Sequence, residues 1–242
     1  MGCAFCASTI GGKVRDLEPC ELLGQIIAAQ VDLGERIDGI VMMGIGEPLD
    51  NYDNVIKFLR LVGHSEGLNI GYRHISLSTC GLVDKIYKLA EEDLPITLSI
   101  SLHASNDEIR SKIMPVNKKW GVDELLDACR TYFDKTGRRI SFEYTLISGE
   151  NDSEENAISL AKKLNSKLRT KSSTMPIHVN LIPVNPVKER DFKKSGKEQI
   201  KKFAAVLESR GIRATVRRTL GADINASCGQ LRRDEMKNTE ND

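Results

Sequence analysis

Short apolar runs alternate with amphipathic stretches along most of this chain, and this alternation restricts the folds open to it. The stretches repeat apolar residues every three or four positions, which is typical of helices. Parallel strands joined by helical crossovers produce such a pattern, and strands buried on both faces read as near-continuous apolar runs. The apolar runs are Ile40–Met43, Ile75–Ser78, Ile96–Leu102, Ile140–Ile147, Ile177–Ile182 and Ala214–Arg218, and the helical stretches are Pro19–Leu33, Asn54–Val62, Val83–Glu91, Val122–Phe133, Ser153–Leu168 and Lys197–Arg210. The sequence therefore predicts an α/β fold with a parallel sheet and helices outside it.

A polar turn follows each of the first five apolar runs. The turns are Gly44–Pro48, Ser78–Gly81, Ser101–Ser105, Ser148–Asp152 and Pro183–Pro186. In β/α barrels and open α/β sheets, binding sites form at the carboxyl ends of the strands. One polar loop alone would indicate nothing, because connecting loops are generally polar and exposed. Five such turns at five strand ends predict one rim around one pocket, with His103 as the candidate histidine on it.

The length of 242 residues suits one barrel-sized domain or two small ones. No apolar run approaches the roughly 20 residues needed to cross a bilayer. The N-terminal letters MGCAFC lack the basic and apolar regions of a secretory signal. We therefore expect a cytoplasmic protein.

Positive charge is concentrated in the C-terminal third. The chain has a net charge of +1, yet residues Ala161 to Arg218 contain 16 Lys and Arg against four Asp and Glu. A polyanionic partner would explain this imbalance. Lysine-rich amphipathic helices with solvated outer faces would explain it as well, and charge alone leaves both interpretations open.

Two of the six cysteines form a C-x-x-C pair, Cys3 and Cys6. Thiolates at this spacing can hold one metal ion or cluster through a single tight turn. An iron–sulfur motif, a redox dithiol, half of a zinc site and a pair without function all fit the spacing. Cys20 and Cys129 fall within helical stretches and are expected in the core, whereas Cys80 lies on the predicted rim.

Two further motifs could carry chemistry. In Gly44–Pro48, glycines would let the backbone approach a ligand closely, and Glu47 offers a carboxylate to an ammonium or hydroxyl group. The same letters fit an ordinary tight turn, and they lack the full dinucleotide-binding fingerprint. Cys228 stands among small residues that leave its thiol reachable, although a free cysteine is more often a buried apolar residue.

Six motifs occur in order along the chain. They are GCAFCAST at Gly2–Thr9, VMMGIGEPLDN at Val41–Asn51, LSTCG at Leu77–Gly81, ISLHASNDEIR at Ile100–Arg110, NLIPVNP at Asn180–Pro186 and ASCGQLR at Ala226–Arg232. Together they resemble the radical S-adenosylmethionine (SAM) RNA methyltransferases, specifically the dual-specificity enzymes that methylate C2 of an adenine in 23S ribosomal RNA and in tRNA. The resemblance runs essentially from end to end. It implies a partial (β/α) barrel of the TIM type over residues 1–231, which includes a C-terminal loop with the catalytic cysteine, and a charged, disordered tail over residues 232–242.

The resemblance also assigns roles to single residues. Cys3 and Cys6 match the second and third cysteines of C-x-x-x-C-x-x-C, which hold a [4Fe–4S] cluster whose fourth iron binds SAM. Cys228 matches the cysteine that carries the methyl group. The residues that match SAM contacts are Gly46, Glu47, Ser78, Ser101, Leu102, His103 and Asn185.

The mechanism implied by this resemblance begins with methylation of the Cys228 thiolate, because adenine C2 is not nucleophilic. A second SAM, cleaved by an electron from the cluster, yields a radical that abstracts hydrogen from the S-methyl group. The resulting carbon radical adds to the ring, and a second cysteine releases the product by forming a disulfide with Cys228. The implied partners are 23S rRNA, tRNA and an electron donor such as flavodoxin or ferredoxin, and we expect a monomer.

The family pattern includes parts that would precede Met1. The first cluster cysteine belongs four positions before Cys3. The resolving cysteine, a proton-accepting glutamate, the first barrel strand and an N-terminal RNA-binding domain belong farther upstream. We therefore expect this chain to be truncated and, as written, to hold no stable cluster and not to turn over.

Some questions stay open at this level. A related adenine-C8 methyltransferase, a non-catalytic RNA-binding remnant and a zinc-binding scaffold are alternatives, and the wording NKKW at Asn117–Trp120 favours the C2 enzyme. Glu143, on a predicted strand, could be structural or part of the site. The candidates for RNA phosphate contacts are Lys162, Lys163, Lys193, Lys194, Lys201, Lys202, Arg213, Arg217 and Arg218.

Overall fold

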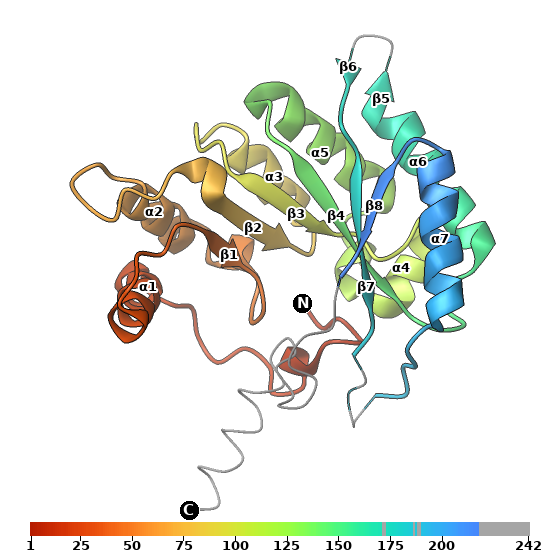
Figure 1. Ribbon diagram of the computed structural model, residues 1–242, viewed down its shortest axis with the longest axis horizontal. Coiled ribbons are helices and arrows are strands. Elements are labelled where there is room, and N and C mark those ends of the chain that lie inside the picture. Colours follow the sequence, from red (N-terminus) through yellow and green to blue (C-terminus); the bar gives the residue numbers. More distant parts are fainter. Residues whose placement is uncertain (171–172, 186, 188–189, 218–242) are drawn as a thin grey trace, which may run out of the picture.

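The computed structural model describes residues 1–170, 173–185, 187 and 190–217. In this part of the chain, six parallel strands form one open sheet in the order β1-β2-β3-β4-β7-β8 (Figure 1). The strands are β1 (Ile40–Met42), β2 (Ile75–Thr79), β3 (Thr97–Ser101), β4 (Ile140–Leu146), β7 (His178–Pro183) and β8 (Arg213–Val216). Because neighbouring strands are parallel throughout, all carboxyl ends lie at one edge of the sheet. The predicted α/β fold with a partial barrel is confirmed.

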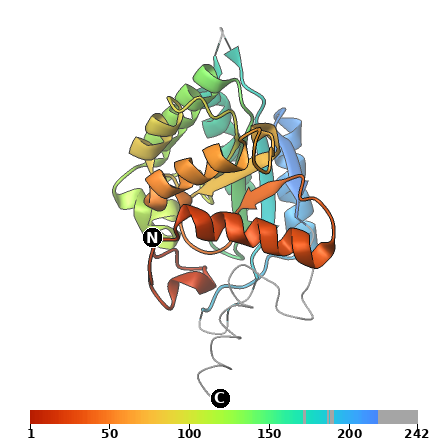
Figure 2. The same cartoon turned by 90° about the vertical axis from the view of Figure 1, so that its left-hand side faces the viewer.

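The helices pack along the outer side of the curved sheet, with α1 and α2 over its first strands (Figures 1 and 2). They are α1 (Pro19–Leu33), α2 (Tyr52–Val62), α3 (Val83–Leu89), α4 (Asp107–Ile113), α5 (Val122–Thr136), α6 (Glu154–Leu168) and α7 (Lys197–Ser209). Four short 3₁₀ turns are η1 (Ala7–Thr9), η2 (Pro48–Asn51), η3 (Tyr72–His74) and η4 (Pro115–Lys118). Within the described residues, no helix is both long and apolar enough to cross a membrane.

Sequence reasoning missed one helix and one two-stranded hairpin. Helix α4 has only seven residues, so the helical period repeats too few times to be visible. Strands β5 (Arg169–Thr170) and β6 (Ser173–Thr174) form a two-residue antiparallel hairpin next to the main sheet. Strands this short give no alternation of their own.

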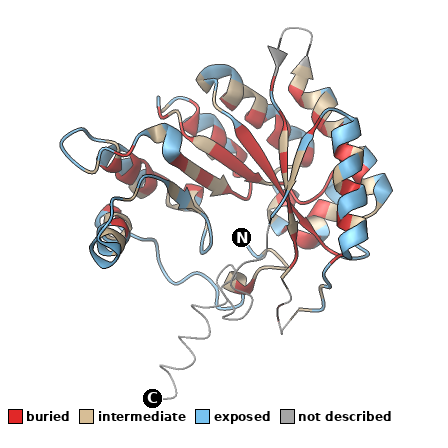
Figure 3. Ribbon diagram, in the orientation of Figure 1, coloured by how far each residue is buried: buried red, intermediate tan, exposed pale blue. Residues whose placement is uncertain are grey.

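The core lies between the sheet and the helices, whose buried sides face the strands in Figure 3. The opposite, inner face of the sheet is polar, and it carries Ser76 of β2, Ser141 and Glu143 of β4, and His178 and Asn180 of β7. In β2 and β7, fully buried residues alternate with half-buried ones. The expectation of apolar burial on both faces is therefore wrong for the inner face, where polar side chains predominate and Val41 and Ile182 are among the apolar ones.

Candidate active site

The segment Gly2–Thr9 lies at the edge where the carboxyl ends of the strands meet, below the sheet in Figure 1. The backbone N–H of Ala4 donates to the carbonyl of Ile113 over 2.8 Å. The Phe5 ring meets the His103 ring edge to face, with ring centroids 5.0 Å apart. The C-x-x-C loop is thus fixed against the ends of α4 and β3 by protein contacts alone.

Cys3 and Cys6 are half-buried free thiols in this loop. The Thr9 hydroxyl lies 2.8 Å from the Cys6 carbonyl and 3.1 Å from the Cys3 carbonyl, and it donates to them. Burial and the nearby Cys6 together raise the pKa of the Cys3 thiol to about 11. A metal ligand must be a thiolate, so bound iron would replace the proton. Within the described residues, no three His, Cys, Asp or Glu side chains could hold a metal ion, so these two thiols fit a cluster only as part of its ligand set.

The turn after β1 places a carboxylate on the same rim. Gly44 and Gly46 have φ angles of 121° and 88°, a region that favours glycine. One oxygen of Glu47 accepts from the Leu49 N–H over 3.1 Å, and the other accepts from the Cys80 N–H over 2.7 Å. Burial raises the pKa of Glu47, and these hydrogen bonds lower it. Each carboxylate oxygen has further lone pairs, so the group can also accept from a ligand ammonium.

Three of the predicted SAM contacts come from neighbouring strand ends. Ser78 is next to last in β2, Ser101 is the last residue of β3, and Asn185 follows β7 by two residues. All three are half-buried. Because these strands are parallel, the side chains lie along one edge, as the rim hypothesis requires.

Leu102 and His103 are placed differently, since both side chains are buried in the protein. His103 has a φ of 57°, and its Nδ1 accepts from the Thr145 N–H over 2.8 Å. Burial lowers the pKa of His103 to about 3, so the ring is neutral at physiological pH. These two residues support the end of β3 and the Cys3–Cys6 loop from beneath.

Arg110 is a site residue that sequence reasoning missed as such. Its side chain has no exposed surface, and burial lowers its pKa. Nε donates to the Leu102 carbonyl over 3.0 Å, and Nη2 donates to the carbonyls of Cys80 and Ser101 over 2.7 and 3.1 Å. Nη1 donates to Asn117 Oδ1 over 2.9 Å. Arg110 therefore ties the ends of β2 and β3 together, and its charge lowers the pKa of the nearby Cys3.

The letters around Arg110 hide this role. An arginine three residues after an aspartate in a short helix resembles an exposed i,i+3 pair. Only the tertiary structure turns the side chain inward, because α4 packs against the strand ends. No local pattern could have indicated it.

The remaining cysteines have distinct positions. Cys129 is buried as expected, but Cys20 is exposed, because α1 packs through Leu22, Leu23 and Ile26 instead. Cys80 is buried on the rim, where burial and the Glu47 carboxylate raise its thiol pKa far above the ordinary value. Cys228 lies outside the described residues, as do Arg218 and the 232–242 tail.

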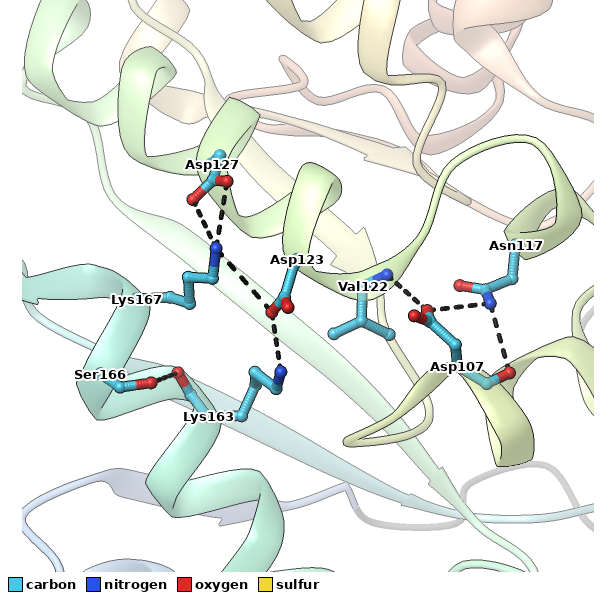
Figure 4. Close-up of polar contacts among 8 residues, drawn as sticks. All are labelled: Asp107, Asn117, Val122, Asp123, Asp127, Lys163, Ser166 and Lys167. Atoms are coloured by element: carbon cyan, nitrogen blue, oxygen red, sulfur yellow. Dashed lines mark hydrogen bonds and ion pairs between the residues drawn. The ribbon is translucent and has the colours of Figure 1, made fainter.

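Two of the candidate RNA-binding lysines, Lys163 and Lys201, pair with carboxylates. Figure 4 shows Lys163 on Asp123 and Lys167 on Asp127, across the outer surfaces of α5 and α6. Lys201 pairs with Glu198 on α7. These pairs favour a solvated helix face at Lys163 and Lys201. The side chains of Lys162, Lys193, Lys194, Lys202 and Arg217 are exposed, and Arg213 lines a cavity at the amino ends of the strands.

Known proteins resemble this chain over nearly its full length. Residues 1–161 match the Radical SAM superfamily model. A protein of Clostridium botulinum (strain Eklund 17B / Type B), named "Probable dual-specificity RNA methyltransferase RlmN", is 56% identical over 240 residues, which are 99% of this chain and 67% of that protein. The chain thus spans about two thirds of the length of such relatives.

Solved structures agree. The crystal structure of a radical SAM methyltransferase from Sphaerobacter thermophilus superposes with a TM-score of 0.88 at 44% identity, covering 95% of this chain and 66% of that one. HydG, a maturase of the [FeFe]-hydrogenase, has a TM-score of 0.65 at 14% identity over 90% of this chain and 50% of its own, which shows a shared fold only. The chain therefore belongs to the radical SAM superfamily and, within it, to the RlmN family of RNA methyltransferases, whose cofactors are a [4Fe–4S] cluster and SAM.

Proposed function

We propose that this chain is the core of an enzyme that methylates C2 of an adenine in 23S rRNA and in tRNA, through a methyl group first carried on Cys228. The observation that supports it most is the position of the Cys3–Cys6 loop. Contacts to His103 and Ile113 fix this loop on the rim that also holds Glu47, Ser78 and Ser101. The names of the relatives support an RNA substrate.

Each rim residue has a defined task in this proposal. Cys3 and Cys6 would bind two irons of the cluster, and Glu47 would accept hydrogen bonds from the ammonium group of SAM. Arg110 would position the ends of β2 and β3 and place a positive charge near the thiolates. When bound, the cluster and SAM supply the electron and the radical that an unreactive ring carbon requires.

Cys228 would act as a soft thiolate nucleophile that receives the methyl group before the RNA does. After the methyl group has joined the RNA, release of Cys228 from the RNA would need a second cysteine, which would form a transient disulfide with it. Among the described cysteines, all five are free thiols. A flavodoxin or ferredoxin as electron donor, a monomeric state and a cytoplasmic location complete the proposal.

Iron binding tests the cluster assignment. A cysteine-alanine dipeptide added before Met1 would complete C-x-x-x-C-x-x-C with Cys3 and Cys6. After anaerobic reconstitution, we expect about four irons per extended chain and almost none in the chain as written. Matched controls are a serine-alanine dipeptide, which should bind no iron, and Cys20→Ser in the extended chain, which should bind as much as its parent. Equal iron in the cysteine- and serine-extended chains, or iron retained after Cys3→Ser, would overturn the assignment.

Base analysis tests the reaction. For this test the chain would be extended with the segment that precedes the matched region in the Clostridium botulinum relative, because product release needs a second cysteine that the dipeptide does not supply. The reconstituted protein would be incubated with SAM, a reductant and a 23S rRNA fragment or tRNA. A peptide map would detect S-methylation of Cys228, and digested RNA would be compared with 2-methyl- and 8-methyladenosine. We expect methylation of Cys228 and 2-methyladenosine as the only methylated product. The variant Cys228→Ala should show neither. The 8-methyl product would refute the C2 assignment. An iron-loaded chain that binds RNA but methylates neither Cys228 nor the RNA would be a non-catalytic remnant.

A further inference from the structure

A cavity of about 690 Å³ opens at the amino ends of the strands, at the opposite end from the candidate active site. Its walls come from the starts of β2, β3, β4, β7 and β8. The volume is in the range of 300–1,000 Å³ that is typical of ligand pockets. Neither the cluster nor SAM, as placed above, would reach this end of the sheet.

Four arginines line this cavity. Arg73 belongs to η3 before β2, Arg138 and Arg139 precede β4, and Arg213 begins β8. None of the four forms an ion pair with a described carboxylate. By contrast, arginines on the outer surface such as Arg15, Arg60 and Arg130 each have one. The amino end of the sheet thus has an uncompensated positive charge.

Some guanidinium donors in the cavity lack a good acceptor. Arg138 Nε is buried and has no hydrogen-bond partner. Arg138 Nη2 reaches the Thr97 hydroxyl only at 3.3 Å, and Arg139 Nη2 reaches His178 Nδ1 at 3.4 Å. A buried charged donor without an acceptor is costly, so it calls for a partner such as a bound ion.

One carboxylate on the inner face of the sheet, Glu143, already has hydrogen-bond partners. Glu143 lies deeper in the barrel, where it accepts from the Ser141 hydroxyl over 3.0 Å and from Asn180 Nδ2 over 2.6 Å. Burial, together with two of the cavity's arginines, lowers the pKa of His178 to about 4, so that ring is neutral at pH 7. The charge of the cavity therefore comes from its arginines.

We propose that this cavity is a binding site for phosphate groups. The planar guanidinium fork matches two phosphate oxygens at once, and serine and threonine hydroxyls on the inner strand faces can donate to others. The same chemistry occurs in the backbone of an RNA and in a free nucleotide. The proposal does not depend on methyl transfer, and it places an anion site at the opposite end of the sheet from the Cys3–Cys6 loop.

Calorimetric titration of the full chain with inorganic pyrophosphate tests the site at low ionic strength. We expect one pyrophosphate per chain. The double variant Arg138→Gln/Arg213→Gln should weaken binding at least about tenfold, since a hydrogen bond to a charged group contributes about 1.5–3 kcal/mol. Lys57→Gln on the outer face of α2 removes one positive charge elsewhere and should leave the affinity within about twofold of the parent.

Two further arms make the result decisive. Arg213→Lys, which keeps the charge but loses the fork, should give an intermediate affinity and rules out misfolding as the cause. Displacement of pyrophosphate by an RNA stem-loop would identify the RNA backbone as the source, and displacement by a nucleoside diphosphate alone would identify a free nucleotide. No pyrophosphate binding, or equal binding by the parent and the Gln variants, would overturn the proposal.

Discussion

Arginines meet the two ends of this sheet in opposite ways. At the carboxyl ends, Arg110 is fully buried and donates to three backbone carbonyls and one side-chain amide. At the amino ends, Arg138 keeps a buried Nε without an acceptor, and Arg213 lines an open cavity. The guanidinium group of an arginine thus has its hydrogen-bond acceptors at the carboxyl edge but lacks one at the amino edge.

The backbone explains the difference. Beyond the last ladder hydrogen bond, a parallel strand presents carbonyl acceptors at its carboxyl end and N–H donors at its amino end. The strands themselves can therefore satisfy an arginine only at the carboxyl edge. An arginine at the amino edge must find its acceptors in loop carbonyls, side chains, water or a bound anion, as Arg36 does in the carbonyls of Leu68 and Asn69. A buried donor that has none of these, such as Arg138 Nε, is therefore the observation that favours a bound anion.

The largest effect is expected from removing the Arg110 side chain at the carboxyl ends of the strands. Arg110→Ala would leave the carbonyls of Cys80, Ser101 and Leu102 buried without donors and open a cavity. We expect a loss of about 3–5 kcal/mol in the free energy of unfolding, measured in urea. Arg60→Ala, which removes an exposed side chain paired with the half-buried Glu92, should lose no more than about 1 kcal/mol. A loss below about 1 kcal/mol for Arg110→Ala would show that the strand ends do not depend on it.

At the amino ends of the strands, the effect of the arginines on His178 can be tested by lowering the pH. The pKa of His178 is about 4 in the folded protein against an ordinary 6.5, because of burial and the nearby arginines. Between these values the unfolded chain binds a proton that the folded one does not, so stability rises with pH through this window and is lost on acidification. His178→Asn should therefore flatten the fall of the urea midpoint from pH 6.5 to pH 4. His64→Asn, in an exposed loop, should leave the slope unchanged, and an equal slope in His178→Asn would contradict the expected pKa.

The smallest effect is expected on the outer surface, where lysines and carboxylates pair in water (Figure 4). A double-mutant cycle with Asp123→Asn and Lys163→Gln should give a coupling of about 0.3–1 kcal/mol. Lys163→Gln should also leave pyrophosphate binding unchanged, because Lys163 lies on α6 outside the barrel. A large drop in pyrophosphate affinity would place the anion site on this helix face instead.

The sequence predicted the sheet edge shared by Glu47, Ser78 and Ser101 but not the amino-end cavity, and the reason is where the signals lie. Polar turns directly follow the apolar runs in the sequence. Once parallel strands are assumed, the residues around Glu47, Ser78 and Ser101 are therefore predicted to lie at the same edge of the sheet. The cavity instead gathers basic residues, from Arg73 to Arg213, that stand just before or at the start of different strands. One basic residue before a strand is unremarkable, so only the folded sheet reveals the cluster.

Charge counting was similarly limited. The excess of Lys and Arg after Ala161 is real, but Lys163 and Lys201 turn toward carboxylates close in space. Lys163 meets Asp123, which is forty residues away in sequence and invisible to a local count. Glu143 shows the same limit, because its hydrogen bonds to Ser141 and Asn180 come from two strands.

The loop that carries Cys3 and Cys6 has a consequence for how metal would enter. The Ala4 hydrogen bond, the Phe5 ring contact and the Thr9 hydroxyl hold its backbone, and none of these contacts uses a cysteine thiol. Fixing one residue of a flexible chain costs about 1–2 kcal/mol of conformational entropy. That cost has already been met by the fold, so more of the binding free energy remains for retaining the metal. We therefore expect the rate of cluster loading to depend on the supply of iron and sulfide rather than on a folding step.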